Sequence, residues 1–566
     1  MPGGSDLQPR PPLVYYRDVA RFYIENFGCR ATQADGAALE RQFLERGLER
    51  AGAVRDAEIV VLNTCTVTAG ADKDARAAIR RLQRVNPECR ILVTGCYAQR
   101  APEELASLPG VTWVVGNSHK HQAAQIATSS FFSEPPSTDC SSAGRGFVPL
   151  GQLSGAEFPP VPRERASMEH PDNVIVGDIF AHTELLAAPV FEAANERTRP
   201  NLKVQDGCDN RCSFCVIPYV RGQSRSQPIE RVVAEVRTLV EAGYREVVIS
   251  GINLGRWGRD LAAARRSLSV GEHDDPSSRH LSSEPPESNP ERPTTNDRRL
   301  VDLIGVILDQ TSLQKLRISS VEPMDWSDEL IGLVASSGRI AKHAHVPMQS
   351  GSDAVLRRMH RKYRPWHYQE KIRKIRAAMP TAAIGADVMV GFPGETEAEF
   401  DQTRRMIEEL PFTYLHVFTY SARPGTPAAE RAGQVPVAVA RERNRVLRAL
   451  GSGKKALFMR SLVGTVVEAI TLQSVGVEFT EALTENYLKM KIFGHYEANR
   501  WMAVNIQGVD GEMLLGRPML DPDWRDEKPG SSPSATEVTL ECKEANKRID
   551  LEHLQAYDNE NREMRE

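Results

Sequence analysis

The sequence has no long run of apolar residues. Its 566 residues are 41% hydrophobic, but no stretch of about 18 consecutive apolar residues occurs, so no transmembrane helix is predicted. The first residues, "MPGGSDLQPRPPLVYYRD", lack the apolar segment of a secretory signal, and none is expected. We therefore expect a cytoplasmic protein.

An excess of either charge is also missing, and cysteine is scarce. Lys and Arg number 71 against 75 Asp and Glu, a net charge of -4, so any nucleic-acid surface must be local. Nine cysteines in a cytoplasmic chain of this length argue against a disulfide framework, which leaves reduced thiols to bind metal. The length exceeds the size at which one hydrophobic core stops growing, so two to four domains are expected.

Three of the cysteines lie together in "VQDGCDNRCSFCVIPYVRG". Cys208, Cys212 and Cys215 have the spacing C-x3-C-x2-C, and no fourth cysteine follows nearby. Cysteine thiolates hold iron–sulfur clusters, usually four to a cubane, so three would leave one iron open to a small molecule. The alternative is zinc. A closed zinc site would need a fourth Cys or His nearby, which leaves a catalytic zinc with an open position as the other interpretation.

Three more cysteines follow strand-like runs near the N-terminus. Cys29, Cys65 and Cys96 end "RFYIENFGC", "AEIVVLNTC" and "CRILVTGC", and helical patterns separate these runs. The alternation predicts a parallel α/β sheet, whose ligands bind at the carboxyl ends of the strands. We therefore expect a second cluster with an open iron, although cysteine is also common as a core residue. Cys89 precedes its strand and is interpreted as structural.

The remaining sequence predicts a multidomain α/β protein. Six further strand–helix repeats indicate a full or partial βα barrel with its chemistry at the carboxyl ends of the strands, and the short β runs that follow indicate a small all-β domain. The expected parts are an N-terminal three-layer α/β domain at 19–127, a flexible linker at 128–174 containing Cys140, the barrel at 175–450 with a polar insert at about 262–298, the all-β domain at 455–525, and a charged tail at 526–566.

These motifs together resemble a known family. The three-cysteine loop after a strand of a βα barrel is similar to that of radical S-adenosylmethionine enzymes, and within them the chain resembles the methylthiotransferases. "FGCRATQADG" and "VTGCYAQ" resemble the N-terminal domain of that family, "HVPMQSGSDAVLRRMHRKY" and "DVMVGFPGETEAEF" resemble its barrel, and the β-rich end resembles the TRAM RNA-binding domain. The resemblance covers about 20–520 without the two inserts.

The resemblance implies two [4Fe–4S] clusters and S-adenosylmethionine. Cys208, Cys212 and Cys215 would bind the cluster that chelates S-adenosylmethionine and cleaves it to a 5′-deoxyadenosyl radical on reduction. Cys29, Cys65 and Cys96 would bind an auxiliary cluster that supplies or relays sulfur, and a second S-adenosylmethionine would provide the methyl group. A flavodoxin- or ferredoxin-type reductant and a monomeric enzyme are expected.

Polar and glycine residues at predicted strand ends are expected near this cofactor. Gly251 and Gly255 allow close backbone approach, and Glu322 and Gln349 can bond the ribose or amino-acid part of S-adenosylmethionine. Ordinary turns and surface loops are the alternatives for these four.

Three other residues carry expectations of their own. Asp387 lies in an apolar run, "GADVMVG", so it is expected to be buried and to need a partner. Phe214 either shields the cluster and stacks near the adenine, or simply packs. Thr32 replaces the Asn that the family usually has after its first cysteine.

The substrate is expected to be tRNA. "QDGCDN" and the Arg225-bearing "RGQSRS" favour the branch that methylthiolates N6-threonylcarbamoyladenosine beside the anticodon. The alternative substrates are isopentenyladenosine in tRNA and an aspartate of a small-subunit ribosomal protein. The alternative to an enzyme is a non-catalytic, metal-containing RNA-binding protein.

The residues expected to bind RNA are Arg358, Lys362 and Lys489. The first two belong to a basic and aromatic cluster (Arg357, Arg358, Arg361, Lys362, Tyr363, Arg364, Trp366), and the third belongs to a modest set in the all-β domain (Lys489, Lys491, Arg500). The alternative for the cluster is the solvated face of a barrel helix.

Overall fold

The structure is a computed structural model that describes residues 19–132, 173–182, 185, 199–261, 299–474 and 478–519. It divides into two compact units. The first contains 39–64 and 74–177 with the first strand, and the second contains 27–38, 65–73 and the chain from 178 onward. The predicted insert at about 262–298, the tail at 526–566, Cys140 and Cys542 lie outside the described residues. Of the predicted linker at 128–174, residues 128–132 are helical, residue 173 lies in a turn, and residue 174 begins a short strand.

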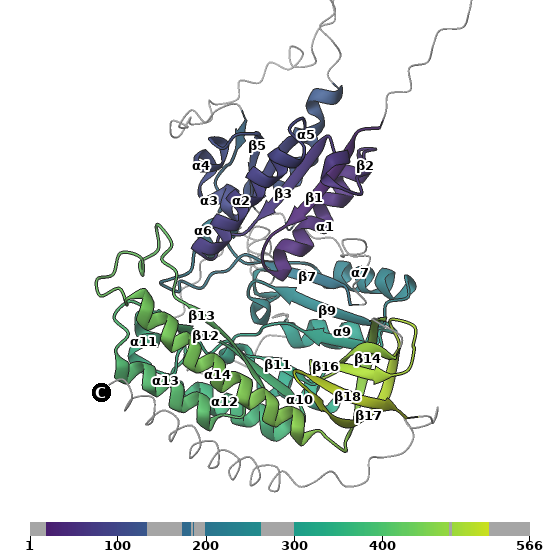
Figure 1. The fold of residues 1–566 in the computed structure, drawn as a ribbon, viewed down its shortest axis with the longest axis vertical. Helices are drawn as coiled ribbons and strands as arrows, with labels where there is room; N and C mark the ends of the chain where they lie inside the picture. The colour runs from purple at the N-terminus through teal and green to yellow at the C-terminus, as the bar shows by residue number, and fades with distance from the viewer. Residues whose placement is uncertain are drawn as a thin grey trace, which may run out of the picture. The chain divides into compact units, whose positions relative to one another are not determined.

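The first unit is built on a parallel six-stranded sheet (Figure 1). Strand β3 is buried along its whole length, as expected of a parallel strand covered on both faces. Phe22 and Val61 face helices α1 and α5, where Phe22 stacks on Phe43 at 5.0 Å between ring centroids. The strand order is β2 (Glu49–Arg50), β1 (Arg21–Asn26), β3 (Ile59–Thr64), β4 (Arg90–Gly95), β5 (Val111–Gly116), β6 (Val174–Ile175), and the helices are α1 (Arg30–Glu45), α2 (Ala69–Val85), α3 (Cys96–Arg100), α4 (Pro102–Ala106) and α5 (Ala123–Phe132).

The second unit contains a partial βα barrel (Figure 1). Two sheets of parallel strands meet where Ser320 bridges His345, and β13 pairs with no strand but β12 among the described residues. Every second residue of the strands packs against the surrounding helices, as Leu202, Leu316 and Ala344 do, so the residues between them face the barrel interior. The strands are β7 (Asn201–Asp206), β9 (Glu246–Gly251), β10 (Lys315–Ile318), β11 (His343–His345), β12 (Ala383–Val390) and β13 (Tyr414–Thr419), with short β8 (Arg225–Ser226) antiparallel to β7.

Helices follow the barrel strands in the expected rhythm. They are α6 (Ile217–Arg221), α7 (Ile229–Glu241), α9 (Leu300–Gln310), α10 (Asp328–Ser336), α11 (Asp353–Arg358), α12 (Pro365–Ala378), α13 (Glu397–Glu409) and α14 (Val437–Ser461). Within the described ranges, none of the helices combines the length and hydropathy that crossing a bilayer needs.

A closed five-stranded barrel follows α14. Its strands are β14 (Val466–Ser474), β15 (Phe479–Thr484), β16 (Lys489–Phe493), β17 (Trp501–Asp510) and β18 (Met513–Pro518), in the order β14-β15-β16-β18-β17. The turn between β15 and β16 contacts the βα barrel, where Arg317 of β10 donates to the carbonyl of Glu485 at 2.9 Å and Asn486 donates to the carbonyl of Thr381 at 3.1 Å. The predicted fold class is therefore confirmed, with the βα barrel partial rather than full.

Candidate active site

The three-cysteine loop begins where β7 ends. Strand β7 is buried and ends at Asp206, after which Gly207 takes a φ of 72°, a left-handed conformation that suits glycine. The loop is fixed by backbone bonds, because Cys208 donates to the carbonyl of Gly222 at 3.0 Å and Cys215 donates to that of Cys212 at 3.1 Å. The sequence places the cysteines at the carboxyl end of a barrel strand, where ligands bind.

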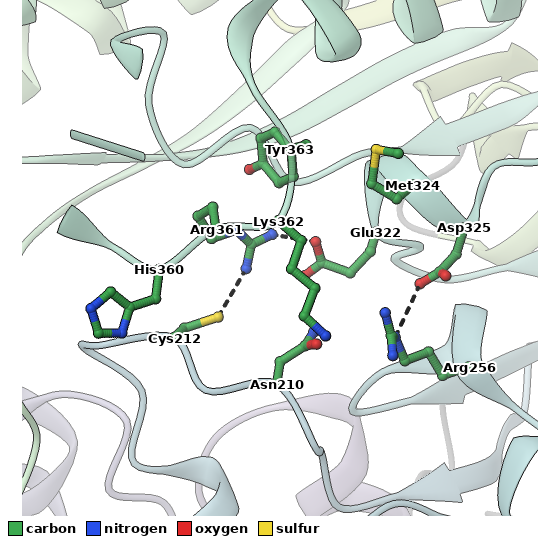
Figure 2. A pocket seen from close by; sticks show the side chains of 10 residues that line it. All are labelled: Asn210, Cys212, Arg256, Glu322, Met324, Asp325, His360, Arg361, Lys362 and Tyr363. Carbon is green, nitrogen blue, oxygen red and sulfur yellow. Dashed lines mark hydrogen bonds and ion pairs between the residues drawn. The ribbon is translucent and has the colours of Figure 1, made fainter. Parts of the chain in front are cut away.

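Nitrogen donors point at two of the three sulfurs. Asn253 Nδ2 lies 3.6 Å from Cys208 Sγ, and Arg361 Nη1 lies 3.3 Å from Cys212 Sγ. Arg361 also pairs with Glu322, so its guanidinium lies between sulfur and carboxylate (Figure 2). Hydrogen bonds to sulfur stabilise thiolate and tune metal–sulfur clusters, so this donor set fits a cluster better than three neutral thiols.

Burial opposes thiolate formation in the absence of a bound metal. It raises the pKa of Cys208, and burial together with the nearby Cys212 raises the pKa of Cys215 to about 12. A metal displaces the thiol proton, so such sulfurs are inert alone and become ligands when a metal binds.

A pocket of about 340 Å³, counting the part open to solvent, lies beside Cys212. Charged side chains of both signs line it, with Glu322 and Asp325 on one side and Arg256 pairing with Asp325 at 3.9 Å (Figure 2). Glu322, which the sequence assigned to S-adenosylmethionine, thus lines the same pocket as Cys212. A pocket with both charges suits a zwitterionic ligand with hydroxyl groups.

The other residues expected near the cofactor are Gln349, Gly251 and Gly255. Gln349 follows β11 in a left-handed conformation (φ 61°), and its Oε1 is buried without a hydrogen-bond partner among the described residues. A Cβ on Gly251 would lie 2.8 Å from Gln205 Oε1, and one on Gly255 would lie 2.4 Å from Asp325 Cβ. The close approach that requires glycine at these two positions is therefore to the protein's own side chains.

Asp387 and Phe214 both have partners. The Asp387 carboxylate lies 3.3 Å from His345 Nε2 and 3.3 Å from His416 Nδ1, so the predicted partner exists, although Asp387 is 28% exposed rather than fully buried. Burial alone would raise the pKa of Asp387, but bonds from the two imidazoles outweigh it and hold that pKa below its ordinary value. Phe214 packs edge-on against Phe392 at 6.4 Å between ring centroids.

The loop that carries Cys29 packs closely against the side chain of Cys65. Gly28 has a φ of 112°, and a Cβ on it would lie 2.6 Å from Cys65 Cβ and 3.0 Å from Cys65 Sγ. Only glycine leaves room for the Cys65 side chain at this point. Thr32 Oγ1 lies 3.6 Å from Cys29 Sγ, so the residue that departs from the family pattern still bonds a cysteine sulfur.

Cys96 directly follows β4 within the first unit. It is buried, and Asn117 Nδ2 lies 3.6 Å from its sulfur. Strands β1, β3 and β4 are parallel neighbours in one sheet, so Cys29, Cys65 and Cys96 each lie within three residues of the carboxyl end of one of them. Cys89 is buried immediately before β4.

Buried ion pairs fix the cysteine-bearing segments of the second unit. Lys203 and Arg221 both pair with Asp35, six residues after Cys29, and with Asp206, two residues before Cys208; Arg221 lies 2.9 Å from Asp35 and 3.0 Å from Asp206. Arg423, after β13, pairs with Asp72, which also accepts a bond from Thr66 at 2.6 Å. Two cations balance two anions in the larger network, so it is internally neutral.

The expected basic cluster is not a single RNA-facing surface. Arg361 and Tyr363 are buried, and Tyr363 donates to the carbonyl of Met348 at 2.7 Å, so neither the expected RNA-binding surface nor its alternative, a solvated helix face, describes these two residues. Arg358 pairs with Glu399 at 2.7 Å, while Lys362 and Trp366 are exposed. Lys489 is exposed at the start of β16.

Sequence reasoning missed the residues that bond the sulfurs. Asn253, Asn117 and Arg361 were not assigned to the cysteines, yet each donates to one of them. Asn253 and Asn117 follow β9 and β5 within two residues, so the strand-end rule that selected the cysteines could have selected them. Arg361 had no comparable signal, because it lies in a loop rich in basic residues.

Comparison with known proteins identifies both halves of this arrangement. Residues 21–116 match a family described as uncharacterized protein family UPF0004, and residues 202–407 match the radical SAM superfamily. Threonylcarbamoyladenosine tRNA methylthiotransferase MtaB of Aquifex aeolicus is 32% identical over 485 residues, which are 85% of this chain and 99% of that protein. MtaB of Bacillus subtilis is 34% identical over 84% of this chain and 91% of its own length.

Other similar proteins are more distant or have another named substrate. The tRNA-2-methylthio-N6-dimethylallyladenosine synthase of Erythrobacter litoralis is 31% identical over 79% of this chain and 86% of its own length. A solved structure of the radical S-adenosylmethionine methyltransferase TsrM from Kitasatospora setae aligns with a TM-score of 0.42 at 15% identity, over 73% of this chain and 74% of that one. By its identity to the methylthiotransferases over most of its length, the chain belongs to the radical S-adenosylmethionine methylthiotransferases, a family of transferases that use S-adenosylmethionine and [4Fe–4S] clusters.

Proposed function

We propose that this enzyme adds a methylthio group to C2 of N6-threonylcarbamoyladenosine next to the anticodon of tRNA. The observation that carries the proposal is the loop of Cys208, Cys212 and Cys215 beside a polar pocket, with nitrogen donors directed at two of its sulfurs. The choice of substrate is supported by relatives that bear this name and match more than four fifths of the chain. Dimethylallyladenosine in tRNA is the second candidate, because relatives with that name are almost as similar.

The six cysteines would divide into two ligand sets. Bound to Cys208, Cys212 and Cys215, a [4Fe–4S] cluster would supply the electron that cleaves S-adenosylmethionine, and one bound to Cys29, Cys65 and Cys96 would supply or relay sulfur. Arg361 and Asn253 would hold negative charge on the first set of sulfurs, and Asn117 and Thr32 would do so for the second.

S-adenosylmethionine would be held by polar groups around the cysteine loop. Glu322 lines the pocket and can accept from the amino group or ribose. Gln349 Oε1, which has no hydrogen-bond partner in the part of the chain that the structure describes, can accept another hydrogen bond from the cofactor. Gly251 would contribute indirectly, because it makes room for Gln205, which accepts from the backbone nitrogen of Asn253 at 2.7 Å.

The partners would be those of a tRNA-modifying radical enzyme. Phosphate contacts from Lys489 and Lys362, with Arg358 near its ion pair to Glu399, would position the tRNA. A flavodoxin- or ferredoxin-type protein would supply electrons, and the enzyme would act as a monomer.

Mass spectrometry of tRNA nucleosides tests the substrate directly. Cells that lack this gene should lose 2-methylthio-N6-threonylcarbamoyladenosine and accumulate its unthiolated precursor. The wild-type gene should restore the product, whereas genes with Cys208→Ala or Cys65→Ala should not. Purified Cys65→Ala protein should still cleave S-adenosylmethionine, but Cys208→Ala protein should not.

Three results would contradict the proposal or a part of it. If cells that lack the gene instead lose the methylthiolated dimethylallyl nucleoside, the substrate is dimethylallyladenosine, the second candidate. Unchanged tRNA nucleosides would leave an aspartate of a small-subunit ribosomal protein as the substrate to assay. Full methylthiolation by Cys65→Ala protein would refute the two ligand sets.

A further inference from the structure

Three arginines face one another around one tyrosine inside the partial βα barrel. Tyr487 belongs to the turn between β15 and β16 and has a φ of 69°. Its hydroxyl accepts from Arg30 Nη2 at 3.2 Å, and the guanidinium carbons of Arg199 and Arg317 lie 6.0 and 5.4 Å from its ring centroid. All of these residues belong to the second unit.

This cluster lies at the amino-terminal ends of the strands. Glu246 and His343 are the first residues of β9 and β11, and Arg317 is the third residue of β10. The neighbours Val247, Leu316 and Ala344 pack against the helices, so Glu246, Arg317 and His343 face the interior. The interior therefore has a cationic group at the strand ends opposite the cysteine loop.

Positive charge exceeds negative charge in this cluster. Glu246 is shared by Arg317 at 2.6 Å and Arg199 at 3.7 Å, and no other carboxylate ion-pairs with the three arginines among the described residues. His343 adds no charge, because burial and Arg317 hold its pKa well below the ordinary value. Arg30 has a neutral phenol as its hydrogen-bond partner. Partly buried guanidinium groups without a counter-charge are costly and favour an anion.

The position of Arg30 connects this charge to the reaction. Arg30 directly follows Cys29, and its carbonyl accepts from Asn201 Nδ2 of β7 at 3.0 Å, so its backbone is fixed to the barrel. Its guanidinium therefore belongs to the segment that carries Cys29, one of the proposed ligands of the cluster that would supply sulfur. The substrate of the proposed function has one carboxylate, on the threonyl part of its N6 substituent, whereas a dimethylallyl substituent has none.

We propose that Arg30, supported by Arg199, binds the carboxylate of the threonylcarbamoyl group and so selects this nucleoside over neutral N6-substituted adenosines. The inference rests on the proposed function. Arginine offers paired donors that match a carboxylate. A neutral substituent would leave the guanidinium desolvated and unpaired, and sites built for a polar group reject analogues that lack it much more strongly than apolar pockets reject a missing methylene.

A double-mutant cycle between protein and substrate tests the proposal. The reconstituted holoenzyme is given anticodon stem-loop RNA that carries either N6-threonylcarbamoyladenosine or the same nucleoside with its carboxylate converted to a carboxamide. Fluorescence anisotropy gives the Kd, and product formation gives kcat/KM. Wild-type enzyme should bind the carboxamide RNA about 10- to 100-fold more weakly, the range for a hydrogen bond between charged partners.

The variant Arg30→Gln keeps a donor for Tyr487 but removes the charge. It should lose about 10-fold or more in affinity for the acid RNA and lose almost nothing for the carboxamide RNA, because the two changes remove the same interaction. Arg199→Gln should show the same pattern with a smaller effect. The control is Arg41→Gln on the same helix, whose exposed side chain pairs with Glu45 at 2.8 Å, and it should change neither affinity.

Each contrary result has a distinct meaning. Equal binding of both RNAs by wild-type enzyme, or an equal loss on both RNAs in Arg30→Gln, would overturn the carboxylate site while wild-type turnover of the acid RNA upholds the proposed function. Wild-type turnover of dimethylallyl RNA but not of the acid RNA would overturn both.

Discussion

At the scale of single residues, the chemistry depends on which atoms face the sulfurs. The sequence predicted the six cysteines from their spacing and from strand ends, because both signals are local. It did not predict Arg361, whose role follows from a loop that brings residue 361 to Cys212 across 149 positions of the chain. A basic residue among basic residues gives no indication that it will be buried, so the sequence assigned Arg361 to RNA rather than to the site.

Arg361→Gln should change the cluster without removing a ligand. Loss of a positive charge next to Cys212 Sγ makes the addition of an electron less favourable, so the reduction potential should fall by roughly 60 mV, which is a tenfold change for a one-electron couple. Potentiometric titration followed by electron paramagnetic resonance measures the shift. Arg357→Gln is the control, because Arg357 is exposed and bonds Asp353 at 2.8 Å. An unchanged potential in Arg361→Gln would mean that its guanidinium does not act on the cluster.

At the scale of elements, buried ion pairs hold the cysteine-bearing segments in place. The sequence predicted strands, helices and their order, because hydrophobic periodicity reports burial of each element on its own. It could not predict that Asp72 at the start of α2 meets Arg423 after β13, because such pairs depend on tertiary contacts between distant segments. Helix α5 also continues to Phe132, past the expected start of the linker at 128.

Asp72→Asn should destabilise the second unit. It leaves Arg423, which is 3% exposed at its side chain, without its carboxylate, and removing one partner of a buried pair costs about 3–5 kcal/mol. Urea unfolding measures the loss, and the iron content after reconstitution should fall because Asp72 also accepts a hydrogen bond from Thr66, which directly follows Cys65. Asp74→Asn, two residues later and exposed, should leave stability and iron content unchanged. Equal stability of Asp72→Asn and wild type would show that the pair orients the two segments without adding to the free energy of unfolding.

At the scale of the whole molecule, the sequence predicted the parts but not their attachments. The five-stranded barrel was expected as a separate RNA-binding domain, yet its Glu468 and Glu485 pair with Lys315 of β10, and its turn accepts bonds from Arg317. Its deletion would remove the two carboxylates that pair with buried Lys315 and the carbonyl that accepts from Arg317, and would leave Arg317 only its pair with Glu246. Truncation therefore cannot separate RNA binding from stability, and a surface substitution is the better experiment.

Lys489→Glu provides that separation. Lys489 is exposed at the start of β16, and it is not one of the residues whose ion pairs attach the domain. If it contacts a phosphate, its reversal should weaken tRNA binding and lower the slope of log K against log salt by about 0.7–0.9, the contribution of one released counterion. Affinity for S-adenosylmethionine should not change. The control is Lys374→Glu on α12, which pairs with Asp328 at 3.3 Å and is 46% exposed. If both variants weakened tRNA binding equally with the same salt slope, the effect would come from net charge, and the five-stranded barrel would have no specific phosphate contact at Lys489.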